Sequence, residues 1–274
     1  MFKAPRSLLL VLVCFTSSCA YQHAYFLSPL DINSHPYKNI PLHSDSTRSA
    51  FYAAMSFGEA YSNYQFRDHL FLFEGNIHRG QNFGHFQAYY GAGLTLGDYH
   101  VSNYSLNYVI GAPFRDTTIN YNTSSDQSFG ALGLTGGINY VVSLPRGGEW
   151  RAIGIETSLQ KEFGSYLNFR KSMVDSNFDI LAIYSLTKTI GVSTEFIWKR
   201  RSGTELGYKM ALGGTIASPN NYLGDQRTDM PLYFSHTFHL TKGHITGYCQ
   251  INFGDHTDSF QFGFNYRLGR ISLY

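Results

Sequence analysis

The sequence is short of charge, tryptophan and cysteine. Only 15% of its 274 residues are charged, and it contains two Trp and three Cys. Soluble globular proteins usually cover themselves with Lys, Glu, Arg and Asp, so this composition argues against an ordinary soluble surface. The 21 Lys and Arg nearly balance the 19 Asp and Glu, for a formal charge of +2. This balance argues against nucleic acid as a partner.

Long apolar runs are also missing. Beyond the first 20 residues, no run approaches the roughly 20 apolar residues that a membrane helix needs. A chain of this kind could cross a membrane only as a closed sheet, because in lipid every backbone polar group must be paired internally. What the sequence does have is 22 Phe, 21 Tyr and 27 Gly, a composition that suits strands and turns.

The first 18 residues have the layout of a secretory signal peptide. Lys3 and Arg6 precede an apolar stretch, and small residues follow before Cys19. The ending Thr16-Ser17-Ser18-Cys19 resembles the lipobox of bacterial lipoproteins, although Thr16 replaces the more common Leu. The resemblance implies cleavage before Cys19 and acylation of that cysteine, with palmitate for example. The alternative is an ordinary signal peptide cleaved nearby, with Cys19 incidental.

The cysteine count agrees with lipidation. Cys14 would leave with the signal peptide and Cys19 would carry lipid, so Cys249 alone would remain and no intramolecular disulfide is predicted. An anchor with several acyl chains holds a protein to a membrane stably. Residues 19–49 contain three Pro and no clean period. We predict that they form a lipidated tether or a plug ahead of a β-barrel domain at 50–274.

Residues 50–274 alternate between apolar and polar with period two, and no helical period competes. The clearest run sets Phe260, Phe262 and Phe264 against Gln261 and Asn265. Candidate strands lie at 50–60, 69–79, 86–96, 131–144, 151–161, 177–186, 189–199, 205–216, 231–241, 244–253 and 260–268. Bacterial membrane barrels have an even number of strands. Either Leu106 to Ile110 adds a strand to these eleven, or a weak candidate is a loop.

The fold class predicted is all-β, a closed antiparallel up-and-down β-barrel of about 10–12 strands. The polar face consists mainly of Gly, Thr, Asn, Gln and Ser, which suits a narrow lumen better than a surface in water, whereas the aromatic face suits lipid. The region 50–274 resembles outer-membrane β-barrel proteins in general, which implies a location in the cell outer membrane. The lipid anchor is implied by the lipobox-like ending at Cys19. Arg270 and Ser272 break the usual alternating end. The alternative is a soluble, lipid-tethered β-barrel or sandwich, with the phenylalanines inside.

Five charged residues fall on the polar face of the candidate strands. They are Glu156, Glu195, Glu205, Lys209 and Arg267. Unpaired charge in a narrow lumen is costly, so these side chains are predicted to form a luminal charge network. The functional alternative is a polar pathway or a ligand site.

The sequence indicates no catalytic, metal or cofactor site. Neither His78 with His85 nor the group His236, His239 and His244 has the spacing of a zinc site, and no G-x-S-x-G motif occurs. Two long polar connections, about 98–127 and 217–229, could contact an envelope protein or a surface ligand. We therefore expect a non-enzymatic structural or binding protein, with outer-membrane lipid as a partner. A passive pore and an enzyme acting on envelope lipid or glycan are the alternatives.

Overall fold

The computed structural model describes most of the chain from Tyr25 onward. The described residues are 25–31, 34–45, 47–62, 68–110, 115–121, 124–173, 180–216, 222–224, 231–254 and 257–269. Cys19 and the signal-like residues 1–18 lie outside them. Within the described residues, no helix is long and apolar enough to cross a membrane.

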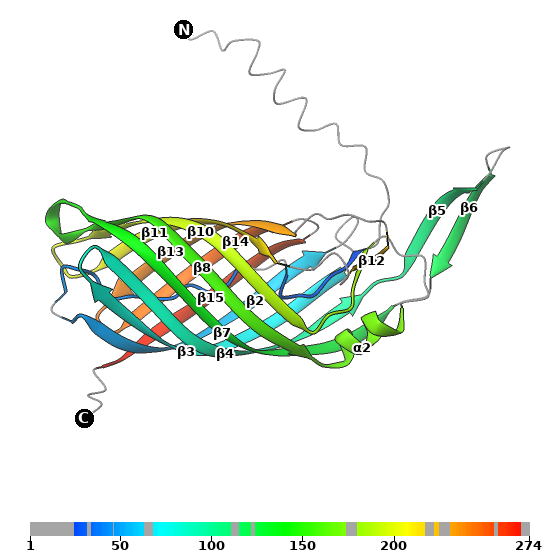
Figure 1. Ribbon diagram of the computed structural model, residues 1–274, viewed down its shortest axis with the longest axis horizontal. Helices are drawn as coiled ribbons and strands as arrows, with labels where there is room; N and C mark the ends of the chain where they lie inside the picture. Colours follow the sequence, from blue (N-terminus) through cyan, green and yellow to red (C-terminus); the bar gives the residue numbers. More distant parts are fainter. Residues whose placement is uncertain are drawn as a thin grey trace, which may run out of the picture.

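Ten antiparallel strands form a closed barrel (Figure 1), which confirms the predicted fold class. Its wall consists of β2 (Ser49–Ser62), β3 (Asp68–Phe83), β4 (Phe86–Val101), β7 (Ser125–Ser143), β8 (Glu149–Phe163), β10 (Leu186–Lys199), β11 (Glu205–Thr215), β13 (Leu232–Lys242), β14 (Ile245–Gly254) and β15 (Thr257–Gly269). Neighbours in the wall follow the chain order, and the last strand, β15, pairs with the first, β2, to close the sheet.

Two of the predicted strands do not belong to the wall. In the candidate 177–186, the described strand is the short β9 (Ile180–Ala182), which lies in a separate small sheet with β1 (Tyr25–Phe26) and β12 (Tyr222–Gly224). The possible strand at Leu106 to Ile110 exists as β5 (Tyr104–Ile110), but it pairs with β6 (Arg115–Tyr121) in a hairpin beyond the barrel (Figure 1). The even count of ten follows because both are outside the closed sheet.

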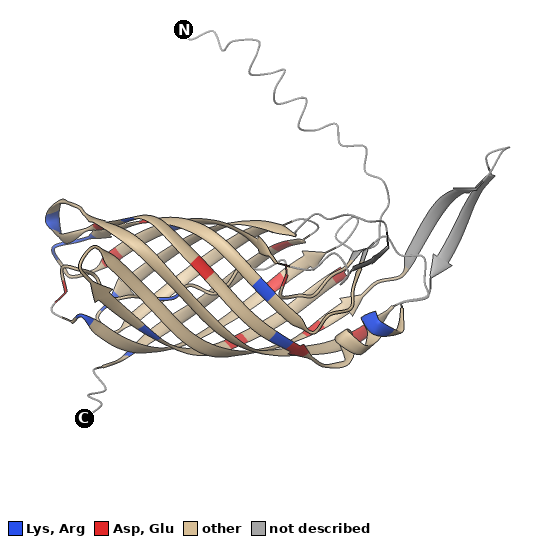
Figure 2. Cartoon of the chain, in the orientation of Figure 1, with Lys and Arg blue, Asp and Glu red and all other residues tan. Residues whose placement is uncertain are grey.

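The apolar face of the wall points outward. Phe260, Phe262 and Phe264 are 48%, 54% and 43% exposed, whereas Gln261 and Asn265 between them are 1% and 0% exposed. The structure thus excludes a core built of these phenylalanines, and the soluble alternative loses its basis. All ten strands contribute large apolar side chains to this outer face. Figure 2 shows long stretches of wall between the few charged positions.

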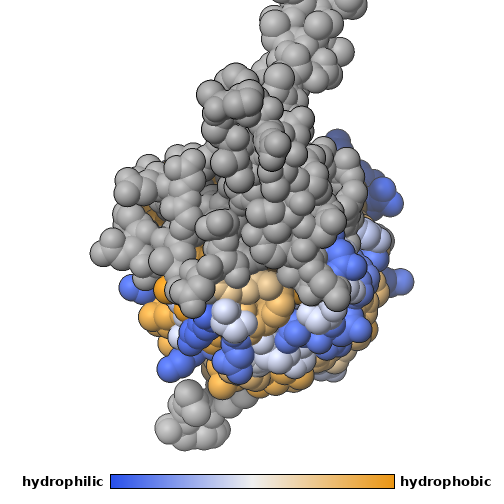
Figure 3. All heavy atoms as spheres, turned by 90° about the vertical axis from the view of Figure 1, so that its right-hand side faces the viewer, coloured by the Kyte–Doolittle hydropathy of each residue, from blue (hydrophilic) through white to orange (hydrophobic). Residues whose placement is uncertain are grey.

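The two ends of the barrel differ. At the turn end the strands are joined by short turns, and Gly84 and Gly243 there have positive φ, which glycine adopts without strain. The turn between β7 and β8 contains a single 3-10 turn, η2 (Pro145–Gly147). At the loop end lie the hairpin, the three-stranded sheet and one helix (Figure 1). Figure 3 looks onto this loop end, where hydrophilic residues gather, with hydrophobic residues along the edge where the wall begins.

The helix at the loop end was not predicted. It is α2 (Ser165–Ser172), and it buries Tyr166, Leu167 and Arg170. Eight residues give too short a window for a helical period to stand out from the alternation on either side. Its position in the connection between β8 and β10 is also where the weak strand candidate was misplaced.

The closure of the sheet predicts an altered mobility on gels. A closed barrel has no free edge from which to unfold, so the protein solubilised in detergent without boiling should stay folded in dodecyl sulfate and migrate differently from the boiled sample. A single band position, with and without boiling, would contradict a closed barrel of this size.

Candidate functional site

The lumen of the barrel is occupied by the chain's own N-terminal segment. We call residues 25–48 the plug; residues 32, 33 and 46 within it are not among those described. The plug runs from the loop end, where Phe26 is buried, to the turn end, where β2 begins at Ser49 (Figure 1). Polar side chains on the inner face of the wall bind it along this path. The candidate site is therefore this filled lumen.

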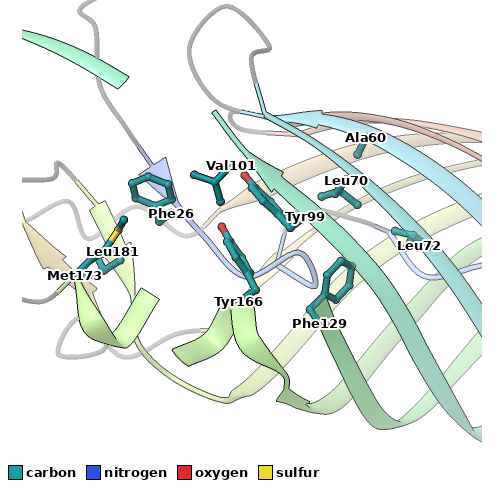
Figure 4. Packing of buried hydrophobic residues seen from close by; sticks show 10 residues of the cluster. All are labelled: Phe26, Ala60, Leu70, Leu72, Tyr99, Val101, Phe129, Tyr166, Met173 and Leu181. Atoms are coloured by element: carbon teal, nitrogen blue, oxygen red, sulfur yellow. The ribbon is translucent and has the colours of Figure 1, made fainter. Parts of the chain in front are cut away.

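An aromatic cluster closes the loop end around the start of the plug. Phe26 lies among side chains from β3, β4, β7 and the connection that carries α2 and β9. Figure 4 shows ten residues of this cluster, which are Phe26, Ala60, Leu70, Leu72, Tyr99, Val101, Phe129, Tyr166, Met173 and Leu181. The rings of Tyr99 and Tyr166 stack with centroids 4.1 Å apart. Burial of this much aromatic surface holds the plug and the loop-end elements together.

A buried ion pair lies beside the cluster. Arg170 of α2 donates from Nη2 to Oε2 of Glu162 at 2.6 Å, and both side chains are fully buried. Ser28 of the plug donates from Oγ to the same carboxylate oxygen at 2.7 Å. The pair therefore joins the helix, the wall and the plug at one point.

Asp31 follows in the plug at the loop-end rim, outside the strands. Its carboxylate accepts hydrogen bonds from the Tyr184 hydroxyl and the Ser28 backbone amide. Burial raises the pKa of Asp31 to about 6, and the Tyr184 hydrogen bond opposes part of that rise. Because the folded-state pKa lies above the unfolded one, this residue favours folding most below pH 4, and that contribution is lost as the pH rises through about 6.

Neutral hydrogen bonds hold the plug midway along the lumen. Gln160 donates from Nε2 to Nδ1 of His35 at 3.2 Å, and Nε2 of His35 lies 3.0 Å from Oγ1 of Thr189. These partners fit a neutral imidazole that accepts at Nδ1 and donates at Nε2. Gln250 donates to Oγ of Ser34 at 2.7 Å.

Another buried contact in the lumen centres on the carboxylate of Glu195, which accepts from three side chains. Arg151 donates from Nη1 to Oε2 at 2.6 Å, while the Tyr37 hydroxyl and Nε2 of His239 lie 2.8 and 2.7 Å from Oε1. The Tyr37 ring stacks on the His239 ring with centroids 4.3 Å apart. Arg151 also donates to the carbonyl of Ile40 at 3.1 Å. One buried carboxylate thus joins three wall strands to the plug.

Backbone carbonyls of the plug are bound near the turn end. The carbonyls of Asn39, Pro41 and Leu42 accept hydrogen bonds from side chains of the wall, which are His78 at 3.0 Å, Gln87 at 3.1 Å and Asn82 at 3.1 Å. Because buried carbonyls need partners, these polar wall residues replace the strand partner that an extended segment would otherwise have. A Cβ on Gly80 would lie 3.0 Å from Pro41, so the plug also approaches the wall closely here.

The five charged residues predicted for the lumen have different places. Glu195 lies in the buried contact described above, and Lys209 pairs with Glu156, from the neighbouring part of the wall. Glu205 and Arg267 are at the turn end, where they line a cavity of about 280 Å³ together with Tyr52 and the Asp45–Lys199 ion pair. The structure therefore does not bring all five into one network.

Several luminal charges were missed from the sequence. Arg151 and Glu149 begin β8, and Glu74 pairs with Lys38 of the plug at 3.5 Å. Alternation with Asn76 and His78 places Glu74 on the inner face, so the pattern in 69–79 could have identified it. Lys38 could not have been found in this way, because the plug has no period.

The histidine groups are divided between the two sides of the wall. His78 and His239 point into the lumen, where His78 stacks on Tyr52 with centroids 5.0 Å apart. His236 lies on the outer face, where Nδ1 is 2.6 Å from the Tyr208 hydroxyl. No group of three side chains suited to a metal occurs among the residues that the structure describes.

The chain is similar in fold to solved outer-membrane β-barrels. These include the β domain of the Bordetella autotransporter BrkA, with TM-score 0.39, 12% identity, and 80% of this chain and 99% of that one covered. For the translocator domain of the autotransporter NalP from Neisseria meningitidis, the TM-score is 0.40 and the identity 10%, with 83% of this chain and 91% of that one covered. For an outer-membrane channel from Pseudomonas putida, the TM-score is 0.39 and the identity 10%, with 87% of this chain and 100% of that one covered. No family model and no curated protein matches the sequence. These likenesses are too distant to assign a function, which has to be argued from the chain's own residues.

The Glu195 contact predicts a large loss of stability when its charge is removed. The substitution Glu195→Gln leaves the buried Arg151 without its carboxylate, which costs about 3–5 kcal/mol for a buried pair. The partly exposed Asp45–Lys199 pair provides the control, since Lys199→Met should cost less than about 1 kcal/mol. Urea unfolding of the refolded barrel measures both. If Glu195→Gln and Lys199→Met lowered the free energy of unfolding by the same small amount, the central role of Glu195 in the lumen would be contradicted.

Proposed function

We propose that this chain is an outer-membrane β-barrel that is closed by its own plug and that has a structural or binding role at its loop end. The observation that carries the proposal is the filled lumen. Polar side chains of its inner face bind the plug at several points, from the Glu162 contact at one end to the Glu149 contact at the other. A wall whose polar face is used in this way supports a fixed scaffold.

The outer surface of the barrel supports its placement in a membrane. Exposed apolar side chains surround the wall, and both Trp residues lie near the turn end, where Trp150 and Trp198 each stack on Phe196. Aromatic residues at the edge of an apolar band are typical of membrane barrels. A soluble protein would expose this surface to water at a high cost.

Charge at the turn end also suits a membrane interface. Among the described residues there, the exposed charged side chains are basic, and they are Arg48, Arg146, Arg200, Arg201 and Lys242. Toward the loop end the exposed charges are of both signs, since Glu59, Asp98 and Asp126 lie there together with Lys161, Lys171 and Lys188. Basic side chains beside an apolar band attract the phosphates of anionic lipid headgroups. Lipid is therefore the first partner that we propose.

The binding role is proposed for the loop end. The hairpin β5–β6 and helix α2 lie beyond the wall there (Figure 1), on the side where the polar connections are longest. Loops held by a rigid scaffold often carry binding sites. The partner would be another envelope protein or a surface ligand. Acylation of Cys19 remains part of this proposal as the anchor of the chain.

A passive pore is the second candidate, and the plug argues against it. Around His35 and Glu74 the free space measures about 20 Å³, room for about one water molecule. We also propose no enzymatic role, since the buried carboxylates and histidines of the lumen bind one another or the plug.

Conductance in planar bilayers tests the closed lumen. The intact protein should insert without giving a steady current, because the plug leaves no continuous path between the ends. The double substitution Tyr37→Ala and Lys38→Ala removes two side chains that bind the wall, so it should produce brief openings. A steady current from the unaltered protein would instead favour the pore.

A charge on the outer wall tests the membrane placement. Phe262 stacks on Phe57 on the outer face and is exposed. The substitution Phe262→Arg should destabilise the barrel folded in lipid vesicles by about 2–4 kcal/mol, as expected for Arg near the middle of a bilayer. Phe262→Leu is the matched control and should cost far less. If urea unfolding gives the same midpoint for both variants, this strand does not face hydrocarbon.

A further inference from the structure

The plug crosses the lumen once, in one direction. Its first described residues pack against the loop end, where Phe26 contacts the cluster that includes Leu70 and Val101. Its last residues bind the turn end, where the Arg48 carbonyl accepts from the backbone amide of Asn82. The plug ends at Arg48 and β2 begins at the next residue, Ser49. The chain therefore passes directly from the plug into the wall at the turn end.

This path is not required to form the wall. Strand β2 starts at the turn end, so a chain that arrived from the turn side could begin the strand without entering the lumen. Instead the preceding residues occupy the whole height of the barrel. The described chain therefore enters the lumen from the loop side, at Tyr25.

The described residues of the plug are bound at points near both ends and between them, which argues against a segment that slips out easily. Ser28 binds Glu162 near the loop end, Tyr37 binds Glu195 midway, and Asp45 pairs with Lys199 at the turn end. Contacts spaced in this way fix both the direction and the register of the segment. Withdrawal toward either end would leave Arg151 and Glu195 without the plug partners that share their burial.

Chain length limits where Cys19 can lie. Five residues lie between it and Tyr25, which makes six steps along the chain, and a fully extended chain covers at most about 3.6 Å per step, or roughly 21 Å. The apolar band of a membrane barrel is about 25 Å tall. Cys19 therefore cannot reach the turn-side leaflet around the outside of the barrel, and the path through the lumen is already filled.

We propose that the N-terminal end of this chain, with any lipid on Cys19, lies on the loop side of the membrane and that its acyl chains enter the loop-side leaflet. The proposal rests on the membrane placement argued above. Membrane barrels of bacteria have short turns in the periplasm and longer loops outside. The loop side is then the cell surface, and the anchor would be displayed there after passing through its own barrel.

Sidedness of three inserted epitope tags tests this topology in the full chain. One tag follows Gln22, a second is inserted in the turn after Ser202, and a third joins the two strands of the β5–β6 hairpin. The turn position has open space around the neighbouring Gly203 and should tolerate insertion. In intact cells, antibody should reach the first and third tags alike, and the second only after permeabilisation. If antibody reached the first tag only after permeabilisation, as it does the second tag, the proposal would be overturned.

The design separates failure of this topology from failure of the membrane placement. If all three tags show the same accessibility before and after permeabilisation, the barrel does not span a membrane. The path of the plug is then tested in purified protein by the pair Ser34→Cys and Gln250→Cys, in a Cys249→Ser background, since these side chains are in contact. A disulfide should form between these two cysteines. It should not form in the control pair Ser34→Cys and Thr241→Cys. Absence of the first disulfide would overturn the threaded path itself.

The lipid is located by a protease site inserted after Gln22. In cells labelled with palmitate, protease added outside should remove the label from the barrel, and Cys19→Ser should carry no label. Label that stays with the barrel until the cells are permeabilised would contradict a loop-side anchor. Label retained in Cys19→Ser would show that the lipid is attached elsewhere, which also contradicts it.

Discussion

The contact between Arg151, Glu195 and the plug is the interaction on which the closed lumen depends. A charge in the interior of a protein is costly unless it is paired and hydrogen-bonded. Glu195 has partners from two wall strands and from Tyr37, and Arg151 binds the plug at Ile40 as well. The wall and the plug therefore complete each other: either one alone would leave buried polar groups without partners.

The plug explains how a polar inner face can be buried inside the barrel. Small polar side chains alone would leave space inside a ten-stranded closed sheet. Here an irregular segment takes that space, and wall amides and imidazoles such as those of Gln87 and His78 bind its backbone carbonyls. At the loop end the chemistry changes, since Leu70 and Leu72 face inward and pack with the cluster around Phe26. The lumen is thus apolar at the loop end and polar along the rest of its length.

Much of the fold could be predicted because period-two alternation is a local signal. The run from Phe260 to Leu268 gave both the strand and its outward face, and the structure confirms them. The apolar inner residues Leu70 and Leu72 could not be understood in this way, because their partners come from the plug and from α2, far away in sequence. The false candidate at 177–186 has the same cause, because a short apolar segment in a loop can pack on the cluster around Phe26 rather than join the wall.

The candidate site was less predictable than the fold. Glu195 and Glu156 could be placed on the polar face by counting along a strand, but their partners depend on which strands lie opposite and on the path of the plug. Lys38 and Tyr37 come from a segment without a period, so no sequence pattern indicates that they enter the barrel. The luminal charges consequently form separate pairs instead of one network. Lys38–Glu74 and Arg151–Glu195 involve the plug, whereas Lys209–Glu156 joins two wall strands.

Amide hydrogen exchange of residues 34–45 measures most directly whether this segment lies inside the folded barrel. Exchange reports how often a backbone segment opens to water. If the plug fills the lumen, peptides from 34–45 should exchange as slowly as those from the wall strands and become labelled only when the barrel unfolds. Complete exchange of this segment within seconds, while β14 and β15 remain protected, would show that the lumen is not filled by it and would contradict the account.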